Sequence, residues 1–544
     1  MGPNKPSSLT KPKFFVLLLL FLSLCALYHT FTYLHSYYSS PQHPRTLPRF
    51  ISFMFSRTPS SGLPSWYAFL AREFKSRKMR IASVDAKFDC GSAKEDVIDV
   101  VNVEFERVSE KQIQWNDLFP EWIDEGNSAQ RCPVVPVPED LGTKYTGIDV
   151  VVAEAPCGVN KRDVYRLQVN LIVANLAVTN RNGPVYVVFV GKCGPMIEVF
   201  RCDDLLWAQE DVRIYKPNPN KLKQKLAMPV GSCQIAHPLV EQGEEEKWRP
   251  KRKREAYVSV LHSSDTYVCG AIALAQSLKQ TNTTKDLLLL VDSSVSQVSL
   301  RALRLAGWDN IKTIQRVKNP HAKKDSYNEW NYSKLRIWSQ QVASEYDKVM
   351  FVDSDVLPLR NMDAFFTYPE LSAAANDNHL FNSGVVVLEP SACTFRTLME
   401  ARAHVVPYNG GDQGFLNEVF VWWHRLPASV NRLKIFASGR NHRHLLPEDV
   451  HAVHYLGQKP WACYRDYDCN WDRSEYQKFA SDSAHERWWR VYDDMPAGLK
   501  EFCALSAKDE ARLQKWRGRA ENASFPDGHW KLKITDPRSH SFIN

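Results

Sequence analysis

The chain has 544 residues, of which 44% are hydrophobic and 24% charged, as is typical of globular proteins. At about 150 residues per domain, this length suggests roughly three to four folded units. The formal net charge of +8 is modest, and the one dense basic run, residues 251–254, fits a solvated linker better than a nucleic-acid patch. We therefore expect no nucleic-acid partner.

An uncharged apolar stretch from Phe14 to Leu34 follows three lysines at positions 5, 11 and 13. As a helix it would measure about 31 Å, enough to cross a bilayer. A cleaved signal peptide is the alternative, but the segment is long and Ala26 is its only plausible small cleavage site. We expect a cytosolic tail over 1–13, one membrane anchor over 14–34, and a lumenal remainder in a single-pass type II protein of the Golgi membrane.

The cysteines agree with a compartment in which disulfides form. Cys25 lies in the apolar stretch, and the other 11 of the 12 cysteines are spread from Cys90 to Cys503. An odd number leaves at least one thiol unpaired, and none of the spacings matches a zinc site. Sequons for N-glycosylation begin at Asn282, Asn331 and Asn522, although Asn331 adjoins a segment that we expect in the active site.

Four regions follow the apolar stretch. Residues 35–88 have little periodicity and are predicted to be a stem. Residues 89–250 contain strand-like and helical segments, and so an extra lumenal α/β region, but no catalytic constellation. From residue 256, strands and helices alternate, which predicts a mostly parallel sheet with ligands beyond the carboxyl ends of its strands. We expect a catalytic domain over 256–475 and a C-terminal extension over 476–544.

The strand predicted for residues 348–352 leads directly into Asp353 and Asp355. On an extended strand both side chains point to one side, and two carboxylates held so close repel each other unless a cation intervenes. Mg²⁺ or Mn²⁺ commonly bridges such carboxylates to phosphates. The spacing alone is a weak signal, because it recurs at Asp466 and Asp468, where no strand precedes it and we favour a surface position.

An alternative class is the aspartate-based phosphohydrolases, in which the first aspartate of this pattern attacks phosphorus. Those enzymes begin their domain with the aspartate-bearing strand and need a later Gly-Asp-x-x-x-Asp motif. Here three strand–helix units come first, and the later sequence GDQGFLNE lacks the second aspartate. The pattern therefore disfavours this class.

Three downstream segments supply groups suited to a sugar and a diphosphate. Asn382 and Ser383 begin a predicted strand, and the glycine-rich segment 409–413 leads Asp412 and Gln413 into a helix. The sequence HYLGQKPW, residues 454–461, then provides an imidazole, a glycine and a lysine. A lone histidine is more often structural than a ligand, but in this company His454 could be a third metal ligand, with Lys459 on the diphosphate.

Six segments in chain order resemble glycosyltransferase family 8, the glycogenin-like group: LHSSDTYVCGAIALAQSL, NYSKLRIWS, FVDSDVLPL, FNSGVVVLEPS, NGGDQGFLN and HYLGQKPW. The apolar N-terminal stretch, the cysteine-bearing lumenal region and the sequence CYRDYDCNW resemble the plant branch that adds glucuronic acid to xylan. The resemblance implies a nucleotide-binding α/β fold of the GT-A type, dependence on Mn²⁺ and retention of anomeric configuration.

The resemblance also implies roles for individual residues. The uracil and ribose would contact Leu261, Ser263, Ser264 and Tyr267. Mn²⁺ would be held by Asp353, Asp355 and His454, with Ser354 between the two acids facing the donor. The donor sugar would contact Lys334, Asn382, Ser383, Gly384, Asn409, Gly410, Gly411, Asp412 and Gln413, and the diphosphate Gly457 and Lys459. Family members commonly have Thr-Asn where this chain has Ser263-Ser264, and an aspartate where it has Asn409.

In this scheme, the metal and Lys459 stabilise the negative charge that develops on the departing diphosphate. The acceptor hydroxyl attacks the same face of an oxocarbenium-like sugar. Asp412 is the nearest candidate for a nucleophile by analogy, although a role in accepting a hydrogen bond from a sugar hydroxyl is favoured.

The resemblance implies transfer of glucuronic acid from UDP-glucuronate to xylose residues of xylan through an α-1,2 linkage, in plant cell wall synthesis. The alternatives are a UDP-glucose or UDP-galactose transferase of the glycogenin or galactinol synthase type, or a non-catalytic partner in a polysaccharide synthase complex with residues 89–250 as its interaction module. A complex with other wall-synthesis enzymes is compatible with either. A glucuronate carboxylate should need a basic partner, for which His379 is our candidate.

Overall fold

The computed structural model describes residues 65–540, except for 76, 88–97, 128, 158–160, 180–182, 239–253, 378 and 437–443. All of these described residues belong to one compact unit, Gly62–Asn544. The expected cytosolic tail and membrane anchor, residues 1–34, lie outside them. Within the described part of the chain, no helix is long and apolar enough to cross a membrane.

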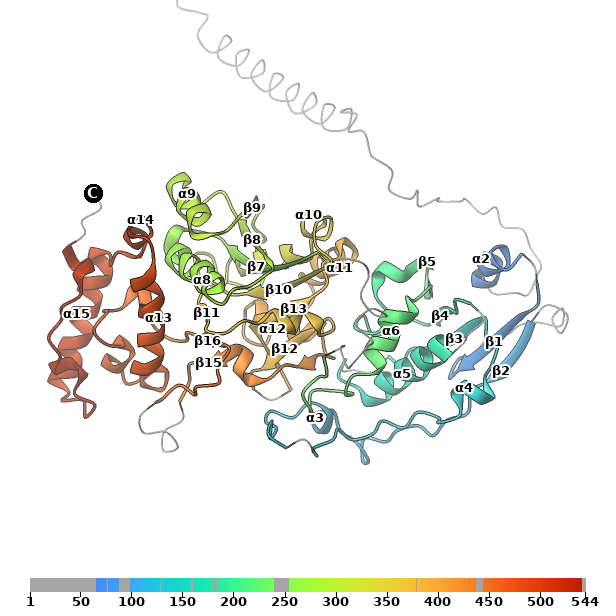
Figure 1. The fold of residues 1–544 in the computed structure, drawn as a ribbon. Coiled ribbons are helices and arrows are strands. Elements are labelled where there is room, and N and C mark those ends of the chain that lie inside the picture. Colours follow the sequence, from blue (N-terminus) through green and yellow to red (C-terminus); the bar gives the residue numbers. More distant parts are fainter. Residues whose placement is uncertain are drawn as a thin grey trace, which may run out of the picture. The chain divides into compact units, whose positions relative to one another are not determined.

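A six-stranded sheet forms the N-terminal region, in the order β2-β1-β3-β4-β6-β5 (Figure 1). Strands β1 to β4 pair in parallel, and β6 is antiparallel to both β4 and β5. The strands are β1 (Met79–Val84), β2 (Ile98–Asn102), β3 (Val150–Glu154), β4 (Tyr186–Val190), β5 (Leu205–Gln209) and β6 (Val212–Tyr215). The helices are α2 (Ser65–Glu73), α3 (Trp115–Leu118), α4 (Leu141–Lys144), α5 (Val164–Thr179) and α6 (Pro219–Leu226).

The expected stem is too long at its C-terminal end. Helix α2 and strand β1 both fall before residue 88, and β1 lies inside the sheet between β2 and β3. The folded region therefore begins by Ser65. A single short strand buried on both faces has no polar–apolar alternation, so its sequence did not distinguish it from an irregular segment.

The second sheet has seven strands in the order β14-β12-β13-β10-β7-β8-β9 (Figure 1). It is mixed, because β13 is antiparallel to its neighbours β10 and β12, whereas β10, β7, β8 and β9 pair in parallel. The strands are β7 (Glu255–Leu261), β8 (Asp286–Val291), β9 (Asn310–Thr313), β10 (Lys348–Val352), β12 (Ser372–Ala375), β13 (Phe381–Leu388) and β14 (His424–Arg425). The helices are α8 (Val268–Gln280), α9 (Gln297–Ala306), α11 (Ala392–Ala401) and α12 (Asp412–Val419).

Strand β10 is buried on both faces, which explains its uninterrupted apolar sequence. Val349 and Phe351 join one hydrophobic core, whereas Met350 and Val352 join another on the opposite face. The first core also contains residues of the N-terminal region, Ala82 and Leu167 among them. The N-terminal region therefore packs against one side of the second sheet.

A small third sheet connects segments that are far apart in the chain. It consists of β11 (Val356–Pro358), β16 (Ala452–His454) and β15 (Arg432–Leu433), in that order. Because Val356 pairs with His454, the sheet brings the segment after β10 next to a residue about a hundred positions later.

One segment whose apolar residues have helical spacing, residues 333–346, forms little α-helix. The first part of this segment belongs to a 3-10 helix, η3 (Asn331–Trp338). Only four α-helical residues follow it, in α10 (Gln340–Ala343). The side chains of η3 are almost all buried, and burial rather than helical periodicity sets its conformation. The remaining 3-10 helices are η1 (Cys202–Asp204), η2 (Asp265–Tyr267), η4 (Asp363–Thr367), η5 (Ala428–Asn431), η6 (Pro460–Ala462), η7 (Cys469–Asp472), η8 (Gln477–Phe479), η9 (Glu501–Cys503), η10 (His529–Lys531) and η11 (Pro537–His540).

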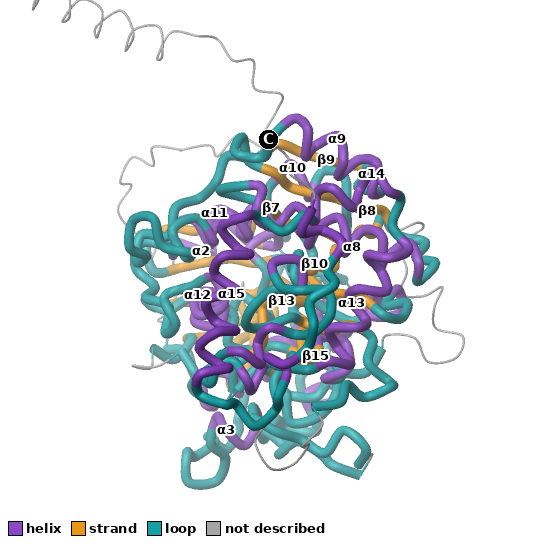
Figure 2. Tube along the Cα trace, turned by 90° about the vertical axis from the view of Figure 1, so that its left-hand side faces the viewer, coloured by secondary structure: helices purple, strands orange, loops and turns teal. Residues whose placement is uncertain are grey.

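The C-terminal extension is helical, with α13 (Asp482–Asp494), α14 (Ala497–Lys500) and α15 (Ala507–Asn522). Figure 2 shows the strands of the interior enclosed by helices and loops, and α13 packs on α8. Five disulfides join the described cysteines: Cys132–Cys233, Cys157–Cys193, Cys202–Cys393, Cys269–Cys503 and Cys463–Cys469. The other two cysteines, Cys25 and Cys90, lie outside the described residues.

Candidate active site

The two acids after β10 lie in a turn rather than on an extended strand. The backbone N–H of Val356 donates to the carbonyl of Asp353 at 3.0 Å, so the chain leaves the sheet at the first acid. Our expectation that one strand face presents both acids is therefore wrong in its geometry. The two side chains nevertheless stay close, because the turn is tight and β11 begins immediately after it.

His454 is brought to this turn by the pairing of β16 with β11. Its Nε2 lies 3.5 Å from Oδ1 of Asp355, and one ligand atom from each of Asp353, Asp355 and His454 lies within 4.8 Å of the others. Burial lowers the pKa of His454 to about 4, which keeps the imidazole neutral. Its Nδ1 faces Oδ1 of Asn431 at 3.2 Å, which suits a proton on Nδ1 and a free lone pair on Nε2. Two carboxylates and a neutral imidazole fit a divalent cation.

Two ammonium groups compensate these acids, one from the buried Lys334 and one from the partly exposed Lys459. Nζ of Lys459 lies 2.6 Å from Oδ2 of Asp355 and 2.5 Å from the carbonyl of Tyr455. Nζ of Lys334 lies 3.2 Å from Oδ2 of Asp353. Burial alone would lower the pKa of both lysines, but the neighbouring carboxylates outweigh it and raise both.

The same charges give the two acids different pKa values. Burial raises the pKa of Asp353 above its usual value, because it outweighs the attraction of Lys334 and is reinforced by the nearby Asp355. Burial opposes ionisation of Asp355 too, but Lys459 and His454 lower its pKa below the usual value. Of the two, Asp355 is the carboxylate that the surrounding protein keeps ionised.

A cavity of about 290 Å³ opens beside this cluster. It is lined by eight predicted site residues, namely Lys334, Asp353, Asn382, Ser383, Asn409, Asp412, Gln413 and His454. It is also lined by polar residues that the sequence did not suggest, namely His262, Tyr327, Asn331 and Asn376.

Asp412 occupies the centre of the polar network in the cavity. It begins helix α12, and its carboxylate accepts hydrogen bonds from Nδ2 of Asn331 at 3.0 Å and from Oγ of Ser383 at 3.2 Å. Oε1 of Gln413 in turn accepts from the backbone N–H of Ser383 at 3.2 Å. The network fixes the orientation of the carboxylate toward the cavity. Asn331 could have been suspected from its position three residues before Lys334.

Some predicted contacts have other partners. Oδ1 of Asn409 accepts from the backbone N–H groups of Gly411 and Gly414, so this side chain shapes the glycine-rich turn. Leu261 is a core residue, 2% exposed, and it does not line the cavity, so its expected position in the nucleoside site stays a prediction. The backbone N–H of Ser263 donates to Oδ2 of Asp292, a buried acid after β8 that the sequence analysis missed.

The remaining predicted positions surround the cluster without lining the cavity. Ser264 caps η2 through the backbone N–H of Thr266, and Tyr267 packs edge-on against Trp461. His379 is outside the lining as well, and its carbonyl accepts from Nε1 of Trp423. The proposal of His379 as partner of a sugar carboxylate thus receives no support from the cavity. Predicted residues Ser354, Gly384, Gly410, Gly411 and Gly457 belong to the turns and strand that carry the lining residues.

Comparison with known proteins gives two matching families. Residues 65–233 match the GUX1-5 N-terminal domain, and residues 259–464 match glycosyl transferase family 8. UDP-glucuronate:xylan alpha-glucuronosyltransferase 2 of Arabidopsis thaliana is 50% identical over 81% of this chain and 77% of its own length. A further protein of that organism is 52% identical over 80% of this chain and 81% of its own length. Glycogenin-1 of Oryctolagus cuniculus is 33% identical over 53% of this chain and 89% of its own length.

The segment that matches the family profile thus contains the aspartates after β10, the histidine of β16 and the polar cavity. The relatives match most of the chain. This chain belongs to glycosyltransferase family 8 and, by its identity with the plant relatives, to the xylan glucuronosyltransferase group within it.

Proposed function

We propose that the protein transfers glucuronic acid from UDP-glucuronate to xylose residues of xylan in α-1,2 linkage, with retention of configuration and in a GT-A type fold. The observation that carries this proposal is the cluster of Asp353, Asp355 and His454 beside a polar cavity in a chain of this family. The donor and acceptor come from the names of the plant relatives. Galactinol synthase 4 of Arabidopsis thaliana, 26% identical over 48% of this chain, represents the alternative donors.

A divalent cation held by Asp353, Asp355 and His454, for which we propose Mn²⁺, would supply positive charge to the diphosphate of the donor. The residues of the chain supply the rest. Lys459 places an ammonium group beside the same acids, where negative charge develops on the leaving diphosphate. Lys334 and Asp412 hold the sugar end of the cavity.

In the favoured scheme, Asp412 accepts a hydrogen bond from a sugar hydroxyl and fixes the sugar for attack. The acceptor hydroxyl attacks the anomeric carbon on the face that the diphosphate leaves, and the leaving phosphate takes its proton. The bond from the anomeric carbon to the diphosphate oxygen breaks as the new glycosidic bond forms. The ammonium groups of Lys334 and Lys459 keep the charge balanced throughout.

We also propose that the protein is anchored in the Golgi membrane by residues 14–34, with residues after 35 in the lumen. The three lysines before this apolar segment support that orientation. The five disulfides of the described part of the chain are in keeping with an oxidising compartment.

The test is a donor screen with the full-length protein in detergent, xylohexaose as acceptor and Mn²⁺ present. We expect transfer from UDP-glucuronate and not from UDP-glucose or UDP-galactose, read from the mass of the product, and an α linkage by NMR. Asp353→Asn should abolish transfer, whereas the same change in the other Asp-x-Asp sequence, Asp466→Asn, should not. Full activity of Asp353→Asn would contradict the metal role, and transfer of a different sugar would contradict the donor.

A further inference from the structure

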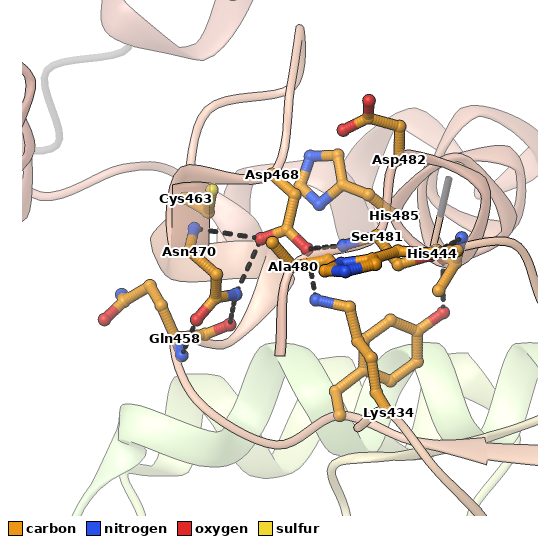
Figure 3. A network of polar contacts seen from close by, with 12 residues as sticks. Lys434, His444, Gln458, Cys463, Asp468, Asn470, Ala480, Ser481, Asp482 and His485 are labelled. Atoms are coloured by element: carbon orange, nitrogen blue, oxygen red, sulfur yellow. Dashed lines mark hydrogen bonds and ion pairs between the residues drawn. The ribbon is translucent and has the colours of Figure 1, made fainter. Parts of the chain in front are cut away.

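In the segment after β16, the residue before Lys459 is held by one side-chain amide. Oδ1 of Asn470 accepts from the backbone N–H of Gln458 at 2.8 Å, and its Nδ2 lies 3.2 Å from the carbonyl of the same residue (Figure 3). Both backbone groups of Gln458 are thus bonded to one side chain twelve positions away. Asn470 itself is fully buried, so its amide has no water to replace these partners.

Asn470 is in turn held by Asp468. Oδ1 of Asp468 accepts from the backbone N–H of Asn470 at 3.1 Å and from its Nδ2 at 2.6 Å, and Oδ2 accepts from the backbone N–H of Ser481 at 2.9 Å. Oδ2 also pairs with the ammonium group of Lys434, and both side chains are 1% exposed. The surface position that we favoured for Asp468 is therefore wrong. The sequence did not reveal its burial, because Lys434, the cation that pairs with it, comes from a segment far away in the sequence.

The same network reaches the other end of the segment. Lys434 follows β15, and its backbone N–H donates to the carbonyl of His454 at 2.9 Å. The pair of Lys434 and Asp468 therefore holds residues 454–459 at two points. Lys434 binds the backbone of His454, the proposed metal ligand, and Asp468 acts through Asn470 on Gln458, the residue before Lys459. Between these points, Gly457 has a φ of +76°, and a Cβ there would lie 2.4 Å from Oδ1 of Asn470. Only glycine fits without displacing the amide.

These contacts argue against a metal site within this network. Cys463, Asp468 and His485 lie close enough to hold an ion, but Cys463 is disulfide-bonded to Cys469 and has no thiolate to offer. The oxygens of Asp468 already accept four hydrogen bonds and ion pairs from the protein, as Figure 3 shows in part. The cluster is better explained as support for the neighbouring segment.

We propose that Asn470, fixed by the buried pair of Asp468 and Lys434, is a positioning residue that places the ammonium group of Lys459 for the diphosphate of the donor. This inference rests on the proposed function of the site. Without the amide, the backbone of Gln458 loses both partners, and Lys459 would be positioned only by its contacts with Asp355 and Tyr455 and by the ligand.

The experiment measures UDP binding to the full-length protein by calorimetry with Mn²⁺ present, so it needs no sugar donor or acceptor. We expect Asn470→Ala to weaken UDP binding about tenfold in the otherwise unchanged protein, but less than about twofold when Lys459→Ala is already present. A purely structural role would give the same factor in both backgrounds, and that result would overturn the proposal. If Asn470→Ala does not fold, Asn470→Ser, which is too short to reach Gln458, takes its place in the same cycle.

Asn170 offers a matched control. It is also fully buried and also binds backbone groups, the N–H of Met196 and the carbonyl of Arg166, but it lies in the N-terminal region. Asn170→Ala should lower the melting temperature without changing the affinity for UDP. An equal loss of UDP affinity in this control would overturn the inference and leave the proposed function intact. Absence of UDP binding by the unaltered protein would overturn the proposed function and this inference with it.

Discussion

The ammonium nitrogen of Lys334 lies 2.5 Å from Oδ2 of Asp412. Because the same nitrogen lies 3.2 Å from Oδ2 of Asp353, one lysine connects the carboxylate of Asp412 in the cavity with a carboxylate of the proposed metal site. A cation bound at this site would therefore change the electrostatic potential at Asp412, because Lys334 contacts both acids.

Asp412→Asn distinguishes the two roles considered for this residue. As an acceptor of a sugar hydroxyl, the carboxylate should be partly replaced by the amide oxygen, and we expect kcat/KM to fall about 10²-fold, mainly through a higher KM for the donor. As a nucleophile, its loss should reduce kcat itself by about 10⁴-fold or more with little change in KM. Steady-state kinetics with UDP-glucuronate separate these outcomes. Asn376→Ala, which alters another lining residue, serves as a control for general damage to the cavity.

The N-terminal region should stabilise the helix that carries Asp412. Arg162 donates to both carboxylate oxygens of Glu418 and to the carbonyl of Asn417, at the C-terminal end of α12. Asn417 in turn exchanges two hydrogen bonds with the backbone of Phe381, directly before Asn382. The contact therefore joins the N-terminal region to two elements of the cavity.

We expect Arg162→Ala to lower the free energy of unfolding by about 1–3 kcal/mol, because it leaves a half-buried carboxylate and a carbonyl without their donor. Urea unfolding of the full-length protein measures this. Arg490→Ala, which removes an exposed ion pair with Glu486, should cost less than about 1 kcal/mol. Equal effects of the two substitutions would show that the Arg162 contact stabilises the protein no more than an exposed ion pair does.

His529 should make the C-terminal extension less stable as the pH rises. Its ring lies between Asp482, at 2.9 Å, and Asp527, at 3.0 Å. Burial alone would lower the pKa of His529, but hydrogen bonds to these two carboxylates raise it to about 9. A raised pKa means that the folded state holds the proton more tightly, so the stabilisation is complete below about pH 6.5 and is lost as the pH rises through about 9.

Since Asp482 is exposed to solvent, screening reduces the effect, and we expect a loss of about 1–2 kcal/mol in the free energy of unfolding between pH 6 and pH 9. His529→Gln should remove this part of the pH dependence. The measurement compares urea unfolding of both proteins at the two pH values. An identical pH dependence in the two would exclude His529 as its source.

The three sequons differ in their accessibility. Asn282 and Asn522 are exposed, at the ends of α8 and α15, whereas Asn331 is 7% exposed and donates to Asp412. In a protein delivered to the secretory pathway we expect glycans on Asn282 and Asn522 and none on Asn331. Enzymatic glycan release in heavy-oxygen water followed by peptide mass spectrometry reads each site. A glycan on Asn331 would contradict its place in the cavity, and bare Asn282 and Asn522 would contradict the lumenal orientation.

Local sequence patterns were enough for the elements that repeat along the chain. The apolar runs of β7, β8 and β10 and the helices α8 and α9 agree with the predicted alternation, because burial on one or both faces imposes a periodicity that the sequence shows directly. The segment 333–346 before β10 is the exception, because it is mostly a 3-10 helix. The direction of β13 was not predictable, since a strand buried on both faces has the same apolar run in a parallel and in an antiparallel pairing.

By itself, the sequence determined which chemical groups stand at the ends of strands: Asp353 and Asp355 after an apolar run, and His454 and Lys459 in one later segment. Only the tertiary structure decided which groups support them, because the partners of Asn331, Asp468 and Lys434 come from segments that pair through long-range sheets and turns. A buried polar residue must find a partner, but no local pattern states where in the chain that partner lies.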